Sequence, residues 1–154
     1  MEYMRLNWNQ IEEMVENVCK QIIEKKFFPN YIIALGRGGL IPARLVSDRL
    51  GINDIGFINV KLYKNVGVKN KEITIKNFND IIENKNILLI DDIADSGETI
   101  EKTIKHLLCT RYKTLKTAVL LIRESIVRKP SFFDRVVKKE WVIFPWEKNI
   151  EEQK

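Results

Sequence analysis

Acidic and hydroxyl side chains gather in one stretch of the sequence that could bind a phosphorylated sugar. An apolar run, 87–90, is followed by the adjacent carboxylates Asp91 and Asp92 and then by the turn 95–99, Asp-Ser-Gly-Glu-Thr. A turn that opens a helix presents free backbone N–H groups to an anion, and its glycine lets a phosphate come close. Carboxylates suit such a site when the ligand also carries hydroxyl groups or a metal ion. The stretch therefore indicates a site for a sugar phosphate with Mg²⁺.

A second loop that could bind an anion, Gly36-Arg37-Gly38-Gly39, follows the apolar run 31–35. By itself it indicates only a tight turn, since it lacks the spacing of the dinucleotide-binding and P-loop fingerprints. Arg37 nevertheless suits a phosphate ligand, because a guanidinium pairs well with phosphate oxygens.

The segments around both loops alternate between strand and helix patterns. Predicted helices span residues 9–27, with Asn9 and Glu12 as a capping box, 42–51 and 98–109. Predicted strands span residues 31–35, 55–60, 86–90 and 117–122, with short strands around Val136 and at 141–144. This alternation predicts the α/β class, with a mostly parallel twisted sheet flanked by helices. Both loops follow strands, where ligands bind on such sheets, so they are expected to share one site.

Residues 87–99 resemble the motif with which type I phosphoribosyltransferases bind 5-phosphoribosyl-1-pyrophosphate (PRPP). The competing interpretation is a solvated acidic turn that caps a helix. That interpretation does not account for the complete motif. The resemblance implies the type I phosphoribosyltransferase fold and PRPP as a substrate. The residues it implies for PRPP binding are Gly36, Arg37, Gly38, Gly39, Asp91, Asp92, Ala94, Asp95, Ser96, Gly97, Glu98 and Thr99.

Residues 36–51 resemble the pyrophosphate loop and following helix of purine phosphoribosyltransferases. The resemblance implies that backbone N–H groups and Arg37 hold the pyrophosphate of PRPP. It also implies a strained peptide bond, cis between Gly36 and Arg37. A flexible loop at about 61–75 is expected to close over PRPP, and Tyr63 is its one candidate functional residue.

The C-terminal stretch 141–147 resembles the hood of bacterial and archaeal xanthine, guanine and hypoxanthine enzymes. By this resemblance Trp141 and Val142 pack against the base, whereas Trp146 is expected to be a core anchor. Arg123 stands where the family has a lysine that binds the exocyclic oxygen of the purine. Arginine also donates to such an oxygen, but its different shape leaves the identity of the base open. The hood is expected to come mainly from 123–150, within a single domain, 1–154.

These resemblances together imply a transferase of purine salvage that acts on a 6-oxopurine (hypoxanthine, guanine or xanthine) and releases pyrophosphate. Asp95 is the implied catalytic residue and manages a proton on the base. Asp92 is the implied Mg²⁺ ligand, largely through PRPP. A homodimer or homotetramer is expected.

Two alternatives stay open at this point. A PRPP-sensing regulator that binds nucleic acid is compatible with the net charge of +5. A phosphoribosyltransferase for another base is compatible with Arg123. The presence of Asp95, Arg37 and Trp141 favours an enzyme, and because no dense basic block with interleaved aromatics occurs, nucleic acid is not an expected partner.

The sequence also favours a cytoplasmic protein. Its longest apolar runs, 31–35 and 87–90, are too short to span a bilayer, and its first residues lack the pattern of a signal peptide. Cys19 and Cys109 lie far apart in helical patterns and are expected to be buried free thiols.

Overall fold

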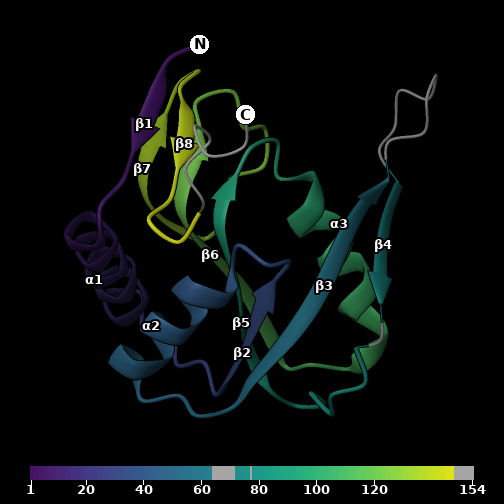
Figure 1. The fold of residues 1–154 in the computed structure, drawn as a ribbon. Coiled ribbons are helices and arrows are strands. Elements are labelled where there is room, and N and C mark those ends of the chain that lie inside the picture. Colours follow the sequence, from purple (N-terminus) through teal and green to yellow (C-terminus); the bar gives the residue numbers. More distant parts are fainter. Residues whose placement is uncertain (64–71, 77, 148–154) are drawn as a thin grey trace.

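The computed structural model of the chain describes residues 1–63, 72–76 and 78–147 (Figure 1). Its elements follow in the order β1 (Tyr3–Arg5), α1 (Trp8–Glu24), β2 (Tyr31–Leu35), α2 (Leu40–Leu50), β3 (Ile55–Tyr63), β4 (Glu72–Lys76), β5 (Asn86–Ala94), α3 (Glu98–Leu107), a 3₁₀ turn (Leu108–Thr110), β6 (Thr114–Arg123), β7 (Phe132–Val137) and β8 (Trp141–Ile143). Strands and helices alternate along most of the chain, and the predicted α/β class is confirmed.

The larger sheet has the strand order β4-β3-β2-β5-β6-β7. Every neighbouring pair is parallel except the hairpin of β3 and β4. The chain adds β3 and β4 on one side of β2 and then crosses over to add β5, β6 and β7 on the other. The carboxyl ends of β2 and β5 therefore form the switch point where ligands bind on such sheets. Ala34 lies opposite Ile90 in this pair, so the loops that follow both strands meet at one edge.

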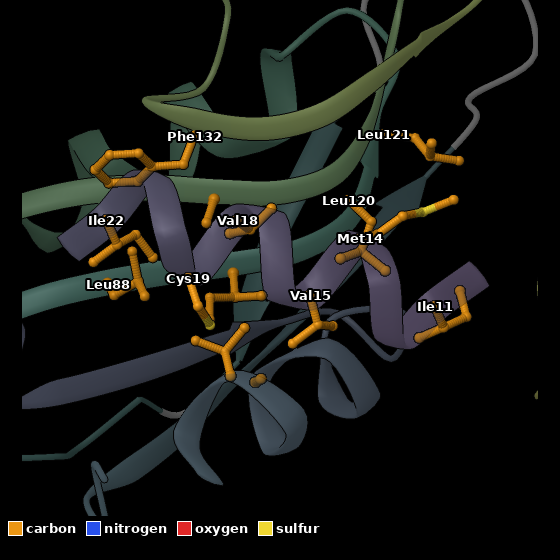
Figure 2. Packing of buried hydrophobic residues seen from close by; sticks show 14 of the residues in the cluster. Ile11, Met14, Val15, Val18, Cys19, Ile22, Leu88, Leu120, Leu121 and Phe132 are labelled. Carbon is orange, nitrogen blue, oxygen red and sulfur yellow. The ribbon is translucent and has the colours of Figure 1, made fainter. Parts of the chain in front are cut away.

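Helices cover both faces of the sheet, with α1 and α2 on one face and α3 on the other (Figure 1). Helix α1 places its apolar residues at helical spacing against the strands. Figure 2 shows Ile11, Met14, Val18 and Ile22 packed with Leu88, Leu120 and Phe132. Successive residues of β5 belong to different clusters, with Leu88 and Ile90 on the side of α1 and Ile87 and Leu89 on the side of α3. Burial on both faces explains why the strand is continuously apolar.

A small second sheet joins the N-terminus to the hood. Strand β1 pairs in parallel with β8, with Tyr3 opposite Trp141. The N–H of Trp141 donates to the carbonyl of Glu2 at 2.7 Å, and the N–H of Leu6 donates to the carbonyl of Ile143 at 3.0 Å. The prediction missed β1, because three residues without a hydrophobic pattern become a strand only through a distant partner.

The N-cap of helix α1 lies two residues earlier than predicted. Its capping box is formed by Asn7 and Gln10, each of which accepts a hydrogen bond from the other's backbone N–H at 2.9 Å. The predicted pair Asn9 and Glu12 was therefore wrong, although it satisfies the same pattern. Leu6 and Ile11, both in the core cluster, flank the true cap as a hydrophobic staple and select it.

Three strands extend beyond their predicted ends. Strand β5 continues to Ala94, because pairing with β6 persists past Asp91 and Asp92. Strand β6 begins at Thr114. Strand β3 continues to Tyr63 and pairs with β4, so the ends of the loop predicted at about 61–75 are strands. Residues 64–71 of that loop lie outside the described residues.

The two cysteines differ in exposure. Cys19 is buried as predicted, whereas Cys109 lies exposed in the 3₁₀ turn, so that prediction was wrong. In the part of the chain that the structure describes, no helix is both long and apolar enough to cross a membrane.

Candidate active site

A pocket of about 260 Å³ opens at the carboxyl end of β5 and the start of α3. Most of the residues predicted to bind PRPP line it. They are Gly36, Asp91, Ala94, Asp95, Ser96, Gly97, Glu98 and Thr99, and the unpredicted residues Val60, Ile93 and Ile100 complete the wall. The predicted residues Arg37, Gly38, Gly39 and Asp92 are not part of this wall.

The turn before α3 has the shape of an anion site. Gly97 caps the helix with a φ of 83°, and a Cβ at this position would lie 2.7 Å from the carbonyl oxygen of Arg128, so only glycine fits. The N–H of Glu98 donates to Ser96 Oγ at 3.3 Å. Thr99 and Ile100 line the pocket, so the first turn of α3, with its positive dipole end, faces the cavity.

The glycine loop touches the acidic strand. Gly36 has a φ of 49°, and a Cβ on Gly38 would lie 2.6 Å from the carboxyl carbon of Asp92. A Cβ on Gly39 would lie 2.8 Å from the carbonyl oxygen of Leu35 and would also overlap that of Ile90. Arg37 is exposed at the tip of the loop. The predicted cis bond between Gly36 and Arg37 was wrong, because no described peptide bond is cis and the left-handed Gly36 turns the chain instead.

Two partly buried carboxyl groups define the electrostatics of the site. Burial, together with the charge of Asp92, raises the pKa of Asp91 well above its usual value, although the N–H of Asp92 donates to Asp91 Oδ1 at 2.9 Å. Burial also raises the pKa of Asp92, and the negative charge of Glu147 contributes to this. The sequence analysis did not select Glu147, although it ends the hood motif 141–147.

These carboxylates fit a partial Mg²⁺ site. Hard oxygen ligands suit Mg²⁺, and its positive charge would stabilise the charged forms that burial, and to a lesser extent neighbouring negative charge, disfavours. Among the described residues no group of three or more His, Cys, Asp or Glu side chains could hold a metal ion by itself. A Mg²⁺ ion at these two carboxylates would need further oxygen ligands from a substrate or from water.

The raised pKa of Asp91 leads to a prediction about stability. Without Mg²⁺ and PRPP at pH 8, Asp91→Asn should raise the free energy of unfolding by about 0.5–2 kcal/mol. Asparagine keeps the acceptor for the N–H of Asp92 but carries no charge. The pKa of Asp91 is higher in the folded than in the unfolded state. The wild type therefore loses stability as the pH rises from the unfolded pKa of this carboxyl group towards its folded pKa. The gain should therefore shrink at pH 5, measured by urea unfolding.

Asp48→Asn is the matched control, because Asp48 lies in an exposed ion pair with Arg44 on α2. Its effect should be small at both pH values. A less stable Asp91→Asn protein at pH 8, or a larger gain at pH 5, would contradict the burial argument.

Arg123 joins the hood to the acidic loop, residues 91–99, which comprises the end of β5, the turn after it and the start of α3. Its Nε donates to Asp95 Oδ1 at 2.8 Å, and its Nη1 donates to the carbonyl oxygens of Lys138 and Glu140 at 3.2 and 2.6 Å. The side chain of Arg123 is only 18% exposed, whereas that of Asp95 is 72% exposed. Arg123, the predicted base-binding residue, is thus hydrogen-bonded to Asp95, the predicted catalytic residue. The sequence analysis did not predict this contact.

The remaining predicted residues lie in different environments. Trp141 is 52% exposed at the start of β8, directly after Glu140, whose carbonyl binds Arg123. Val142 is 7% exposed and belongs to the core cluster. Trp146 stacks on Phe144 with ring centroids 4.7 Å apart, consistent with the core role expected of it. Tyr63 ends β3, and its side chain lies outside the described residues.

Comparison with protein families gives one match that spans nearly the whole chain. Residues 6–153 match the family described as Phosphoribosyl transferase domain. A similar curated protein is the xanthine-guanine phosphoribosyltransferase of Desulfotalea psychrophila. It is 28% identical over 149 residues, which cover 92% of this chain and 84% of that enzyme.

Solved structures share the same architecture. The purine phosphoribosyltransferase of Pyrococcus horikoshii superposes with a TM-score of 0.84 at 29% identity, over 97% of this chain and 96% of that one. The xanthine-guanine-hypoxanthine phosphoribosyltransferase of Helicobacter pylori has a TM-score of 0.86 at 22% identity, over 99% of this chain and 98% of that one. The second match, at this identity, is evidence for the fold alone.

Proposed function

The chain belongs to the phosphoribosyltransferase domain family, and we propose that it transfers the 5-phosphoribosyl group of PRPP to a 6-oxopurine, with release of pyrophosphate. Membership makes it a PRPP-dependent glycosyltransferase. The names of its relatives support a purine as acceptor, since they include xanthine-guanine and purine phosphoribosyltransferases.

One observation carries the proposal for a 6-oxopurine. Asp95 and Arg123 bind each other through Oδ1 and Nε, and neither Asp95 Oδ2 nor Arg123 Nη2 has a hydrogen-bond partner among the described residues. The pair therefore offers a hydrogen-bond acceptor beside a donor. An oxopurine carries the complementary groups on one edge, with a proton on N7 and a carbonyl oxygen on C6. Adenine carries an amino group on C6 instead, so two hydrogen-bond donors, this amino group and the guanidinium, would face each other.

The proposed chemistry uses Asp95 at the imidazole side of the base. In the tautomer that carries its proton on N7, N9 has a free electron pair. That pair forms the bond to C1 of the ribose while the bond from C1 to the pyrophosphate oxygen breaks, and pyrophosphate leaves with those electrons. The N7 proton passes to Asp95 Oδ2, which prevents positive charge from building on the purine.

The rest of the pocket would hold PRPP. The start of α3, with Ser96 and Thr99, suits the 5-phosphate, and Asp91 and Asp92 suit the ribose hydroxyls. Arg37 and the backbone N–H groups of the glycine loop suit the pyrophosphate, because they can donate to its oxygens. Binding PRPP at both ends would hold the reacting atoms close together. When bound through Asp92 and PRPP, Mg²⁺ supplies positive charge against the leaving pyrophosphate.

The setting of the enzyme is part of the same proposal. We expect purine salvage in the cytoplasm and a homodimer or homotetramer. Sedimentation of the purified protein at several concentrations tests the oligomeric state, and a monomer throughout would contradict it.

The test of the function is a panel of bases assayed with PRPP and Mg²⁺. Pyrophosphate release is measured with hypoxanthine, guanine, xanthine, adenine, uracil and orotate. We expect turnover with at least one 6-oxopurine and a kcat/KM for adenine lower by about 10²-fold or more, because a donor would face a donor. Preference for adenine or a pyrimidine would overturn the proposal. Binding of PRPP without turnover, together with salt-sensitive binding of nucleic acid, would favour a regulator.

A further inference from the structure

The side chain of Arg123 connects three segments that are distant in sequence. It leaves the end of β6, contacts Asp95 in the acidic loop, and reaches the turn between β7 and β8. Both hydrogens of Nη1 are used there, because the carbonyl oxygens of Lys138 and Glu140 converge on this one nitrogen. With Nε also engaged, the plane of the guanidinium has a fixed orientation.

The turn that Arg123 holds leads directly into the base side of the hood. Lys138 N–H donates to Glu140 Oε2 at 2.9 Å, and the next residue, Trp141, begins β8. The two carbonyls that bind Arg123 thus belong to the turn that sets the start of β8. The position of Asp95 and the position of this turn are consequently coupled through a single side chain.

We propose that Arg123, besides offering Nη2 to the base, has a second role as a positioning residue, which fixes the distance between Asp95 and the hood turn 138–140 so that both sides of the base site are formed before the base arrives. The planar fork is what this role needs, because three acceptors in different directions are bound at once. A lysine would keep the charge, but its single ammonium lacks the planar fork that orients donors toward all three. The expected effect on the KM for the base rests on the proposed function, whereas the expected effect on the structure of the turn does not.

The structural test needs no substrate. Hydrogen exchange of backbone amides in residues 137–143 is compared between the wild type, Arg123→Lys and Arg123→Gln, after equal unfolding midpoints show that each is folded. Exchange in the turn should be about tenfold faster in both variants, because the anchor of its carbonyls is lost. Arg44→Lys is the matched control, since Arg44 also pairs with an aspartate but lies exposed on α2. Exchange unchanged from the wild type would overturn the positioning role.

The kinetic test separates base recognition from a general loss of structure. In Arg123→Lys the KM for the base should rise about tenfold, with the KM for PRPP unchanged, because the 91–99 loop keeps its own contacts. Equal changes for both substrates, or none, would overturn the link to base recognition. A wild type that is inactive on every base would refute the proposed function instead, and hydrogen exchange would still decide the positioning role.

Discussion

Asp95→Asn should lower kcat by about 10²–10⁴-fold while leaving the affinity for PRPP largely unchanged. An amide cannot take the N7 proton, so the purine would have to carry positive charge as N9 attacks. Asparagine keeps an oxygen for the N–H of Arg123 Nε, now 2.8 Å from Asp95 Oδ1, so the hood and the loop should keep their geometry. Steady-state kinetics with the preferred base, together with calorimetric titration of PRPP and Mg²⁺, measures both quantities.

Asp48→Asn is again the appropriate control for this loss, because it removes an equivalent charge from an exposed helix position. Its kcat should equal that of the wild type. If Asp95→Asn loses PRPP affinity in step with turnover, Asp95 acts in substrate binding and not as the group that accepts the proton. An Asp95→Asn protein with normal turnover would remove Asp95 from the mechanism altogether.

Gly39→Ala should destabilise the folded protein by about 3 kcal/mol, the largest stability effect expected in the glycine loop. The backbone of Gly39 is right-handed, with a φ of −73°, so alanine adds no torsional strain. Its Cβ would nevertheless overlap the carbonyl oxygen of Ile90 and lie 2.9 Å from the backbone nitrogen of Leu35. These are backbone atoms in paired strands β2 and β5, which cannot move aside as a side chain can.

Gly51→Ala gives the matched comparison, because Gly51 presents the opposite case. No atom lies within 4 Å of a Cβ built there, but its φ is +67°, so alanine costs only the strain of a left-handed residue, about 1 kcal/mol. Urea unfolding of both variants measures the difference. A smaller loss for Gly39→Ala than for Gly51→Ala would show that the switch point tolerates separation of β2 and β5.

Strand β5 also carries two carboxyl groups that folding places unfavourably. Folding partly removes the carboxyl groups of Asp91 and Asp92 from water, which raises both pKa values, and the charge of Asp92 raises that of Asp91 further. Such an arrangement opposes stability in the absence of a ligand, and PRPP with Mg²⁺ would offset it. The gain in stability expected for Asp91→Asn would then come from a carboxylate that the proposed function uses to hold the ribose hydroxyls.

The sequence by itself determined the fold class and most of the residues that line the pocket at the end of β5. Apolar runs such as 31–35 and 87–90 predict buried strands, and helical spacing predicts α1, because both patterns depend on neighbours within a few residues. The acidic loop 91–99 was identifiable for the same reason, since its strand, turn and helix start are contiguous. The family resemblance drawn from these residues is confirmed.

Only the tertiary structure decided how distant segments meet. Asn7 and Asn9 both satisfy a capping pattern, and the burial of Leu6 beside Ile11 selects Asn7. Strand β1 exists through its pairing with β8. The contact of Arg123 with Asp95 joins residues from two strand ends, and the effect of Glu147 on Asp92 joins the hood to β5. Hydrogen bonds and charges act over a few ångströms of space whatever the separation along the chain, so these contacts leave no periodic pattern in the sequence.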